Sequence, residues 1–311
     1  MDKKVKVQVL MSTYNGEKYV KSQIESILSQ SNIEADILIR DDGSTDGTIS
    51  IIENLKEIYP QRITYYTGNN LGYKRSFLEL LKKAEIDKYE FFAFSDQDDY
   101  WLSSKLKIAV NKIKNNSNKY KLYASTVFIT DENLKVLYKK DISDFKKGFA
   151  STLTRVRLAG CTMVFNKNLV KVMTNFEFKN MVDNVVPTHD GLIMLVNAAI
   201  NGYTYIDQDA YIYHRRLKSS VTSGGNGIRK RILHEKDIMF GHTGNIGYVS
   251  NLLINTIPQL MTKQSKKFSY MIINYKKNYI QTIKLAMNPN IDCGIWVANI
   301  ESRLRILLRL W

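Results

Sequence analysis

Short apolar runs alternate with longer segments of helical periodicity along the N-terminal third of the chain. The apolar runs, which predict strands, are Val5–Met11, Ala35–Arg40, Ile63–Tyr66 and Phe91–Ser95. The segments between them with apolar residues at helical spacing are Glu17–Gln30, Thr48–Tyr59 and Arg75–Ala84. This alternation predicts an α/β fold, with a mostly parallel sheet covered by helices on both faces. Such sheets bind ligands at the carboxyl ends of their strands.

A polar loop follows each predicted strand. The four loops are Ser12–Gly16, Asp41–Thr48, Asn69–Arg75 and Asp96–Asp99. Because parallel strands end at the same edge of a sheet, all four loops should meet there. The sequence therefore predicts a single site built from segments that lie far apart in the chain.

The loop after the fourth strand carries three carboxylates, Asp96, Asp98 and Asp99. Like charges repel, and each loses hydration at the end of a buried strand, so a cation is expected beside them. Mg²⁺ and Mn²⁺ take oxygen ligands and often bind substrate phosphates, which suits an Asp-x-Asp motif. The alternative is a solvated acidic turn in which Asp96 caps a helix that begins near Ser103. The strongly apolar strand before the motif favours the metal site.

Further strands and helices are predicted beyond the acidic loop. The strands are Tyr120–Thr130 and Lys135–Tyr138, and a buried helix covers Leu192–Ile200. Asp190 lies at the start of that helix, where a carboxylate can cap it and benefit from the helix dipole. Gly160 either lets a substrate approach the backbone or serves packing. Ser219–Gly227 is either a lid or a linker.

The composition is that of an ordinary folded protein, with 44% hydrophobic and 24% charged residues. Cys161 and Cys293 match no metal-ligand spacing and are expected to be reduced thiols of a cytosolic protein. Met1–Val5 offers no apolar signal region, and no uncharged run reaches the roughly 18 residues of a spanning helix. These features predict a cytoplasmic chain that does not cross a membrane.

The formal net charge of +15 is concentrated in the tail, where residues 229–311 carry 13 Lys and Arg against 4 Asp and Glu. This excess suggests a polyanionic partner, either nucleic acid or an anionic membrane face. The tail's helix-like runs are Ile238–Leu260, Phe268–Met287 and Ile295–Trp311. Its end, Ser302–Trp311, is basic and amphipathic, as in helices that lie on a bilayer. Packing on the rest of the fold or at a homodimer seam is an equal alternative.

Four segments together resemble the nucleotide-sugar domain of family-2 glycosyltransferases with the GT-A fold. They are "MSTYNGEKYVKSQIESILSQ", "ILIRDDGSTDGT", "NLGYKRSF" and "FFAFSDQDDYW". The form Ser-Asp-Gln-Asp-Asp-x-Trp is most similar to bacterial rhamnosyltransferases that build cell-wall or capsular polysaccharide. The likeness covers residues 5–215 and implies a catalytic domain at 1–228, with a donor half near 1–100 and an acceptor half near 101–228. In the acceptor half, Arg157–Asn166 resembles the acceptor-side strand of the family. Residues 229–311 would form a basic helical region.

The resemblance implies that a pyrimidine base lies against the first two loops. Ser12, Thr13 and Tyr14 would hold the base, although Tyr14 equally suits a core position at a strand end. Asp42 would accept a hydrogen bond from the imide N–H of the base. Asp41 and Asp42 are also compatible with a purely structural turn.

The resemblance implies that the next two loops bind the diphosphate and its cation. The resemblance implies that Lys74 and Arg75 neutralise the diphosphate, although they could equally begin a solvated helix. Asp98 would bind Mn²⁺ or Mg²⁺, and Asp96 would bind the ribose, the metal or a metal-bound water. Asp99 would orient the loop.

The resemblance also implies a catalytic base. Asp190 would take the proton of the acceptor hydroxyl as its oxygen attacks the anomeric carbon, and His189 would orient Asp190 or contact the donor. Gly191 departs from the aromatic residue that close relatives often have there, which puts the shape of the acceptor pocket in doubt. His214 and Arg215 match an element that lies near the phosphates in relatives, in an ambiguous register.

The sequence therefore predicts a metal-dependent, inverting glycosyltransferase. The expected donor is dTDP-L-rhamnose, and the expected acceptor is a lipid-linked glycan at the inner face of the plasma membrane, reached through the C-terminal helices. A UDP-hexose donor is the first alternative. A basic nucleic-acid-binding protein is a remote alternative, because no nucleic-acid module is recognisable and nucleic acid is not an expected partner. A sugar-binding relative without activity is the third.

Overall fold

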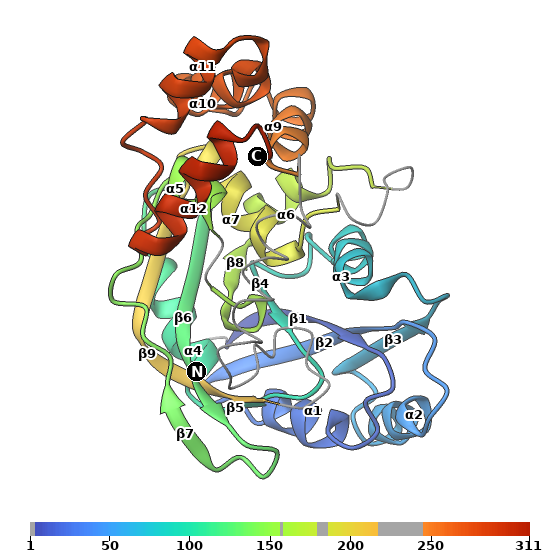
Figure 1. Cartoon of the computed structure of the whole chain (residues 1–311). Helices are drawn as coiled ribbons and strands as arrows, with labels where there is room; N and C mark the ends of the chain where they lie inside the picture. Colours follow the sequence, from blue (N-terminus) through green and yellow to red (C-terminus); the bar gives the residue numbers. More distant parts are fainter. Residues whose placement is uncertain (1–3, 156–157, 179–185, 217–244) are drawn as a thin grey trace.

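The computed structural model describes residues 4–155, 158–178, 186–216 and 245–311, in which one large sheet carries helices on both faces (Figure 1). The first half of the sheet is parallel, with the strands β1 (Val5–Thr13), β2 (Ile33–Asp41), β3 (Ile63–Thr67) and β4 (Phe91–Ser95). The connecting helices are α1 (Val20–Leu28), α2 (Thr48–Ile58) and α3 (Gly72–Lys82). The predicted α/β fold is confirmed.

Successive residues of these strands face two different apolar cores. Val9 packs in one core with Ile24 of α1, whereas the next residue, Leu10, packs in the other core with Phe77 of α3. This two-residue alternation is typical of a strand that is covered on both faces. A ligand can therefore reach the strands at their ends, where the polar loops lie.

The second half of the sheet mixes parallel and antiparallel strands. Its strands are β5 (Tyr100–Trp101), β6 (Lys121–Thr130), β7 (Val136–Lys139), β8 (Val164–Asn166) and β9 (Tyr203–Arg215). Its helices are α4 (Lys105–Ile113), α5 (Phe149–Thr154), α6 (Lys167–Met173) and α7 (His189–Ala199). The strand order is β3-β2-β1-β4-β8-β6-β9-β5, with β7 paired to β6. The strand that joins the two halves, β8, runs antiparallel to both of its neighbours, β4 and β6.

The predicted strand Arg157–Asn166 is wrong over most of its length. Gly160–Thr162 forms a 3₁₀ turn, η1, and only Val164–Asn166 is extended in the sheet. The turn is closed by Thr162, whose N–H and Oγ1 both donate to the carbonyl oxygen of Ala159 at 3.1 and 2.7 Å. A threonine hydroxyl that binds nearby backbone competes with strand pairing.

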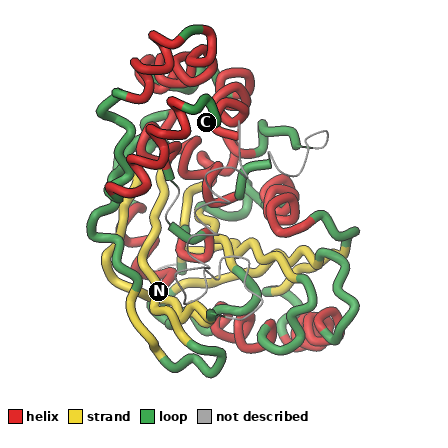
Figure 2. Tube along the Cα trace, viewed as in Figure 1, coloured by secondary structure: helices red, strands yellow, loops and turns green. Residues whose placement is uncertain are grey.

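Helices form the C-terminal part of the fold (Figure 2). They are α9 (Asn245–Thr256), α10 (Lys263–Asn274), the 3₁₀ turn η2 (Tyr275–Lys277), α11 (Tyr279–Ala286) and α12 (Trp296–Leu307). The helix-like run Phe268–Met287 is divided between α10 and α11, because Asn278 has an extended backbone and its side chain accepts a hydrogen bond from Gln281 N at 2.9 Å. Asn278 thereby caps a new helix. The first residues of the predicted helix Ile238–Leu260, the segment Ser219–Gly227 and the expected boundary near residue 228 lie outside the described residues.

The C-terminal helices share an apolar core with the sheet. Leu253 of α9 and Ile306 of α12 belong to the same cluster as Leu192 of α7. Trp311, the last residue of the basic segment Ser302–Trp311, is buried, so this side chain packs on the fold and does not face a bilayer. The Tyr275 hydroxyl donates to the carbonyl oxygen of Trp311 and accepts from its N–H, both at 3.0 Å. None of the helices in the described ranges is long and apolar enough to cross a bilayer.

We expect Tyr275→Phe to lower the free energy of unfolding by about 1–3 kcal/mol, because it leaves buried backbone groups of Trp311 without partners. Tyr270→Phe is the matched control, since Tyr270 is exposed on α10, the helix that precedes Tyr275, and it should change stability by less than about 0.5 kcal/mol. Urea unfolding of both variants measures the difference. Equal stabilities would show that these hydrogen bonds do not hold the C-terminus.

Candidate active site

Hydrogen bonds join the loops after β1, β2 and β4. The side-chain oxygen of Gln97 accepts from the N–H of Tyr14 at 2.8 Å, and its amide nitrogen donates to the Tyr14 carbonyl oxygen at 3.0 Å. The N–H of Asn15 donates to Oγ of Ser44 at 2.9 Å, and Asn15 Oδ1 accepts from Thr45 N at 2.8 Å. These three loops therefore meet at one edge of the sheet, as their positions after parallel strands predict.

Asp41 holds the shape of the second loop. Its carboxylate accepts from Thr13 Oγ1 at 2.9 Å, from Ser44 N at 2.8 Å and from Ser44 Oγ at 2.6 Å. Gly43, which follows, has a φ of 86°, a left-handed conformation that favours glycine. The turn role that the sequence left open for Asp41 is what the structure shows.

Asp42 joins the loop after β3 to the other three loops. Its buried carboxylate is paired with Arg40 and accepts from the N–H groups of Leu71 and Gly72, both at 2.8 Å. Arg40 also donates to the Asn69 carbonyl oxygen at 2.9 Å. Oδ2 of Asp42 accepts only the Gly72 bond among the described residues, so it keeps acceptor capacity. Its contact with a nucleotide base remains a prediction.

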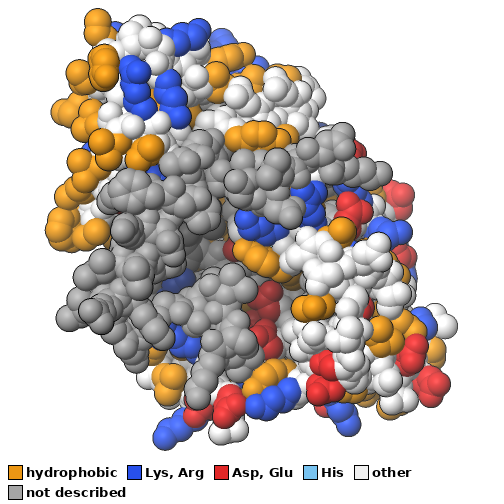
Figure 3. Space-filling view, turned by 45° about the vertical axis from the view of Figure 1, so that its right-hand side comes forward, with side chains coloured by type: hydrophobic (Ala, Val, Ile, Leu, Met, Phe, Trp, Pro, Cys, Tyr) orange, Lys and Arg blue, Asp and Glu red, His pale blue; other side chains and the backbone are white. Residues whose placement is uncertain are grey.

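The acidic loop resists ionisation. Burial, together with the neighbouring charges of Asp99 and Asp98, raises the pKa of Asp96 to about 8. Burial and the charge of Asp99 likewise raise the pKa of Asp98 to about 6. Acidic side chains gather near the middle of the face shown in Figure 3. A cation bound here would displace the protons and relieve the repulsion.

His214 and Arg215 at the end of β9 supply positive charge to this loop. Nδ1 of His214 lies 2.8 Å from Oδ1 of the fully buried Asp99, whose charge raises the pKa of His214 to about 9. Arg215 Nη1 donates to the backbone carbonyl oxygens of Asp98 and Asp99 at 2.7 and 3.0 Å. The guanidinium also lies 4.7 Å from the ring centre of Tyr19. Both residues therefore hold the acidic loop, and their contact with a diphosphate remains a prediction.

The residues present fit a hard divalent cation at Asp96 and Asp98, because both are partly exposed carboxylates and carboxylate oxygens suit Mg²⁺ and Mn²⁺. Asp99, Cys161 and His214 also bring one ligand atom each within 4.8 Å of the others. Burial raises the pKa of the Cys161 thiol well above its usual range, and Asp99 already binds the His214 nitrogen. This second group is therefore the poorer fit for such a cation.

Asp190 lies in the first turn of α7, opposite the acidic loop. The N-cap of the helix is Thr188 and not Asp190, and Oδ1 of Asp190 accepts from Gly191 N at 2.7 Å. Burial, then the charges of Asp190 and Asp96, raise the pKa of Tyr73, so this hydroxyl is within electrostatic reach of both carboxylates. The charge of Asp190 also contributes to the raised pKa of Asp96. The structure thus brings the two acidic sites of the sequence together.

His189, the residue before Asp190, is part of the core. Its ring stacks on Phe77 with centroids 3.8 Å apart and meets the Phe94 ring edge-on at 4.7 Å. Burial lowers the pKa of His189 to about 4, so the imidazole is neutral at physiological pH. A Cβ at Gly160 would lie 2.4 Å from His189 Nε2 and 3.3 Å from the Asp190 Cβ. This packing favours the orienting role for His189 and the packing role for Gly160.

The other predicted donor residues lie around the same loops. Tyr14 is 46% exposed, which contradicts the core alternative for this side chain, and Thr13 is buried. Ser12 Oγ lies 2.6 Å from Ser76 Oγ of α3. Arg75 and Lys74 are half-buried at the start of α3, where Arg75 Nη1 donates to the Phe178 carbonyl oxygen at 2.6 Å.

Sequence reasoning missed four residues that shape the site, namely Tyr19, Arg40, Tyr73 and Gln97. A charged residue inside an apolar strand was the available signal for Arg40, since a buried charge requires a partner. Tyr73 stands beside the predicted Lys74, and Gln97 stands between the two metal-binding candidates. Nothing in the sequence pattern distinguishes Tyr19 from an ordinary helix residue.

Comparison with known proteins gives the chain a family and a fold. The profile of glycosyl transferase family 2 matches residues 8–173, just over half of the chain. The chain is 29% identical over 219 residues to dTDP-rhamnosyl transferase RfbG of Shigella flexneri, which covers 68% of this chain and 72% of that protein.

Two solved structures resemble the whole chain. S. aureus TarS 1-349 in complex with UDP-GlcNAc has a TM-score of 0.59 and 17% identity, covering 97% of this chain and 82% of that one. Mannosyltransferase PcManGT from Pyrobaculum calidifontis, in complex with GDP-Man and Mn²⁺, has a TM-score of 0.52 and 15% identity, covering 100% and 88%. At these identities the two structures show the fold, and the predicted GT-A fold is confirmed.

We expect Gly160→Ala to lower the free energy of unfolding by about 1–3 kcal/mol, because the added methyl group meets a buried ring that cannot move aside. Gly247→Ala is the matched control, since a Cβ there would have no neighbour within 4 Å. Chemical denaturation compares the two variants. Equal stability would show that the loop around Gly160 yields easily.

We expect the raised pKa of Asp96 to make stability depend on pH in the absence of divalent metal. The folded protein holds a proton that the unfolded chain releases near pH 4, so stability is lost as pH rises toward 8. The loss is at most about 1.4 kcal/mol per pH unit. Unfolding in EDTA from pH 5 to 8 should therefore show a steeper decline for the wild type than for Asp96→Asn. Added Mn²⁺ should flatten the wild-type curve, and identical slopes without metal would contradict the assignment.

Proposed function

The chain belongs to glycosyl transferase family 2, and we propose that this glycosyltransferase moves L-rhamnose from dTDP-L-rhamnose to a hydroxyl group of a growing, lipid-linked cell-surface polysaccharide. The transfer would invert the anomeric configuration and would use Mn²⁺ or Mg²⁺. The likeness to dTDP-rhamnosyl transferase RfbG and the motif Ser-Asp-Gln-Asp-Asp-x-Trp support this donor.

One observation carries the proposal. His189, the neighbour of Asp190 at the start of α7, meets the ring of Phe94 in β4 at 4.7 Å, two residues before Asp96. Besides burial, the charges of Asp190 and Asp96 both raise the pKa of Tyr73. A transferase needs this pairing, because one side must hold an anionic donor through a cation while the other side activates the acceptor. A purely structural acidic turn would not require a second carboxylate from a distant helix.

Asp190 is proposed as the catalytic base. Its carboxylate would take the proton of the acceptor hydroxyl while the oxygen attacks the anomeric carbon and the bond to the diphosphate oxygen breaks. The backbone N–H of Gly191 and the packed ring of His189 hold Asp190 in one orientation. A positioned carboxylate of this kind loses little entropy at the moment of reaction.

The donor is proposed to lie along the joined loops. The exposed ring of Tyr14 and the remaining acceptor capacity of Asp42 suit a pyrimidine base. Asp98 and Asp96 would hold the cation, which would offset charge on the departing diphosphate. Lys74 and Arg75 at the start of α3 are proposed to add positive charge near the same diphosphate.

A UDP-hexose is the alternative donor. TarS binds UDP-GlcNAc, and uracil and thymine present the same imide group to a carboxylate. The acceptor end of the proposal rests on the resemblance to enzymes that act on lipid-linked glycans. Residues 1–228 would then be the catalytic domain and 229–311 a helical region at the inner face of the plasma membrane.

A donor panel tests the proposal. We expect dTDP-L-rhamnose with Mn²⁺ or Mg²⁺ to raise the melting temperature and to be slowly hydrolysed, more than UDP-glucose, UDP-galactose or UDP-GlcNAc. Preference for a UDP-sugar would replace the donor and keep the enzyme class. If none of the four donors stabilises the protein in a metal-dependent way, the proposal is wrong.

We expect Asp190→Asn to lower sugar transfer by about 10²–10⁴-fold, the usual contribution of a positioned base. Donor binding, measured by calorimetry, should stay within about twofold, because Asp190 is assigned to the acceptor side. Asp87→Asn is the matched control, since Asp87 is exposed in the loop that precedes β4, at the other end of that strand. A loss of donor binding equal to the loss of transfer would remove Asp190 from the base role.

A further inference from the structure

The last helix, α12, is packed with its apolar side outward. Its buried residues are the polar Glu301, Ser302 and Arg305 together with Ala298 and Ile306. Its exposed side chains include Trp296, at 72% exposure, and the aliphatic residues Val297, Ile300, Leu304, Leu307 and Leu308. A surface helix of a globular protein normally buries its apolar side and exposes its polar side. An apolar row of this length on a surface indicates an interaction site.

Helix α11 extends the apolar surface. Ile280, Ile283 and Met287 are exposed at helical spacing on its outer side. Arg303 of α12 donates to backbone carbonyls at the end of α11, and Arg309 stacks over Tyr279 at its start, with 4.2 Å to the ring centre. The two helices therefore lie side by side and antiparallel. We call the exposed apolar side chains of α11 and α12 named above the apolar edge. In Figure 3 hydrophobic side chains run along the upper left edge of the molecule.

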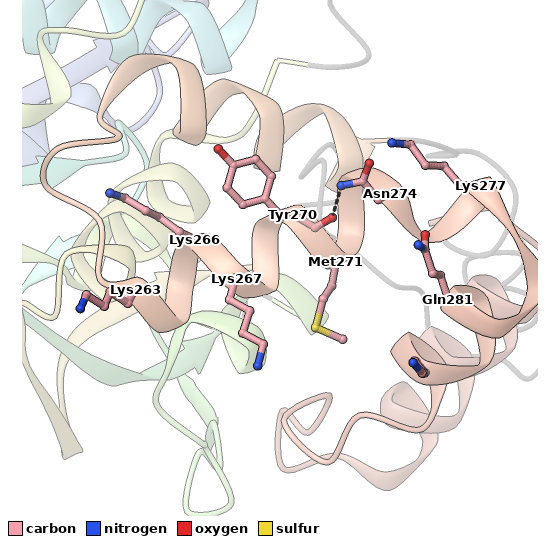
Figure 4. A pocket seen from close by; sticks show the side chains of 9 residues that line it. Lys263, Lys266, Lys267, Tyr270, Met271, Asn274, Lys277 and Gln281 are labelled. Atoms are coloured by element: carbon pink, nitrogen blue, oxygen red, sulfur yellow. Dashed lines mark hydrogen bonds between the residues drawn. The ribbon is translucent and has the colours of Figure 1, made fainter.

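A basic pocket borders the apolar edge. It lies between α10 and α11, has a volume of about 670 Å³ and is lined by five lysines together with Tyr270 and Met271 (Figure 4). The lysines are Lys263, Lys266, Lys267, Lys277 and Lys284. Within the described ranges none of these lysines forms an ion pair. On α11 the pocket-lining Gln281 and Lys284 each follow an apolar-edge residue, Ile280 and Ile283, so the two surfaces are adjacent sides of one helix.

The charge of this region is not neutralised internally. Residues 245–311 carry nine Lys and Arg against two acidic residues. Asp292 is paired with Lys146, and Glu301 is buried beside Arg155. The lysines therefore present positive charge to the solvent next to exposed aliphatic and aromatic side chains.

We propose that the apolar edge and the basic pocket together dock the protein on an anionic phospholipid bilayer. The pocket binds the phosphate of a lipid headgroup, and the side chains of the apolar edge enter the boundary between headgroups and acyl chains. Trp296 has the amphipathic ring that favours this depth. A second copy of the chain fits less well, because a symmetric contact at this edge would bring two sets of lysines together.

This inference adds to the proposed function a place where the enzyme meets its acceptor. The two are tested separately, because vesicle binding is measured without a donor sugar. A protein that binds vesicles but hydrolyses no donor would fail the proposed function alone. A protein that turns over its donor and ignores vesicles would fail this inference alone.

The tryptophans give a direct readout. Trp101 and Trp311 are each 1% exposed, so Trp296 is the tryptophan of the chain that can report an outer contact. We expect vesicles of phosphatidylcholine and phosphatidylglycerol in equal parts to shift the fluorescence of the full chain to the blue, and lipids with brominated acyl chains to quench it. Trp296→Phe should abolish both signals. Equal signals with pure phosphatidylcholine would overturn the anionic selectivity.

Charge variants test the pocket. Lys266→Gln, Lys267→Gln and Lys284→Gln combined should weaken cosedimentation with the mixed vesicles by about 100-fold. The control removes the same charge from exposed lysines in or next to α1 and α4, through Lys21→Gln, Lys107→Gln and Lys114→Gln, and should weaken it less than about threefold. If the two triple variants weaken vesicle binding equally, the effect is one of total charge, and the assignment of headgroup binding to the pocket is wrong.

The dimer alternative has its own outcome. Ile280→Ser, Ile283→Ser and Ile300→Ser combined should reduce vesicle binding and leave the sedimentation coefficient of the free protein unchanged. A dimer of the wild type that these changes dissociate, together with no vesicle binding, would assign the edge to a second copy. Urea unfolding of each variant verifies that it is folded.

Discussion

Repulsion between carboxylates at one edge of the sheet is the constraint on which the site depends. Asp41 ends β2 and Asp42 follows it, and Asp96, Asp98 and Asp99 follow β4. These two strands lie on either side of β1. Burial makes each negative charge expensive, and proximity adds a further cost. The fold places these groups together because parallel strands end side by side. It must then supply positive charge or hydrogen-bond donors to each of them.

The protein meets this constraint in different ways along the edge. Asp42 has the Arg40 guanidinium and backbone N–H groups, Asp41 has hydroxyls and N–H groups of its own turn, and Asp99 has the His214 ring. Asp96 and Asp98 are left with raised pKa values. Their charge is thus the portion that protein groups do not offset, which is why a divalent cation fits there. The bonds between loops also mean that the site is assembled before a ligand arrives, which lowers the entropy cost of binding.

The helix that carries Asp190 connects the site to the C-terminal helices. Leu192 in α7 belongs to the same core as α9, α10 and α12, and the carbonyl oxygen of Ala199 at the end of α7 accepts a hydrogen bond from Thr262 N at 2.9 Å. The position of the proposed base therefore depends on the packing of the tail. The same tail leaves the apolar edge uncovered. One segment thus packs against the helix that carries Asp190 with one side and carries the proposed docking surface on the other.

The order of strands and helices in the first half, the meeting of polar loops at one edge and the acidic residues there could all be predicted from the sequence. Periodicity and strand direction are local properties, which is why they are legible in the chain alone. Tertiary structure decided which charges became partners. His214 reaches Asp99 across 115 positions, and no local pattern encodes that distance. It also decided that Trp311 is buried while Trp296 is exposed. An amphipathic pattern shows that a helix has an apolar side, but only packing against the rest of the chain determines whether that side faces inward.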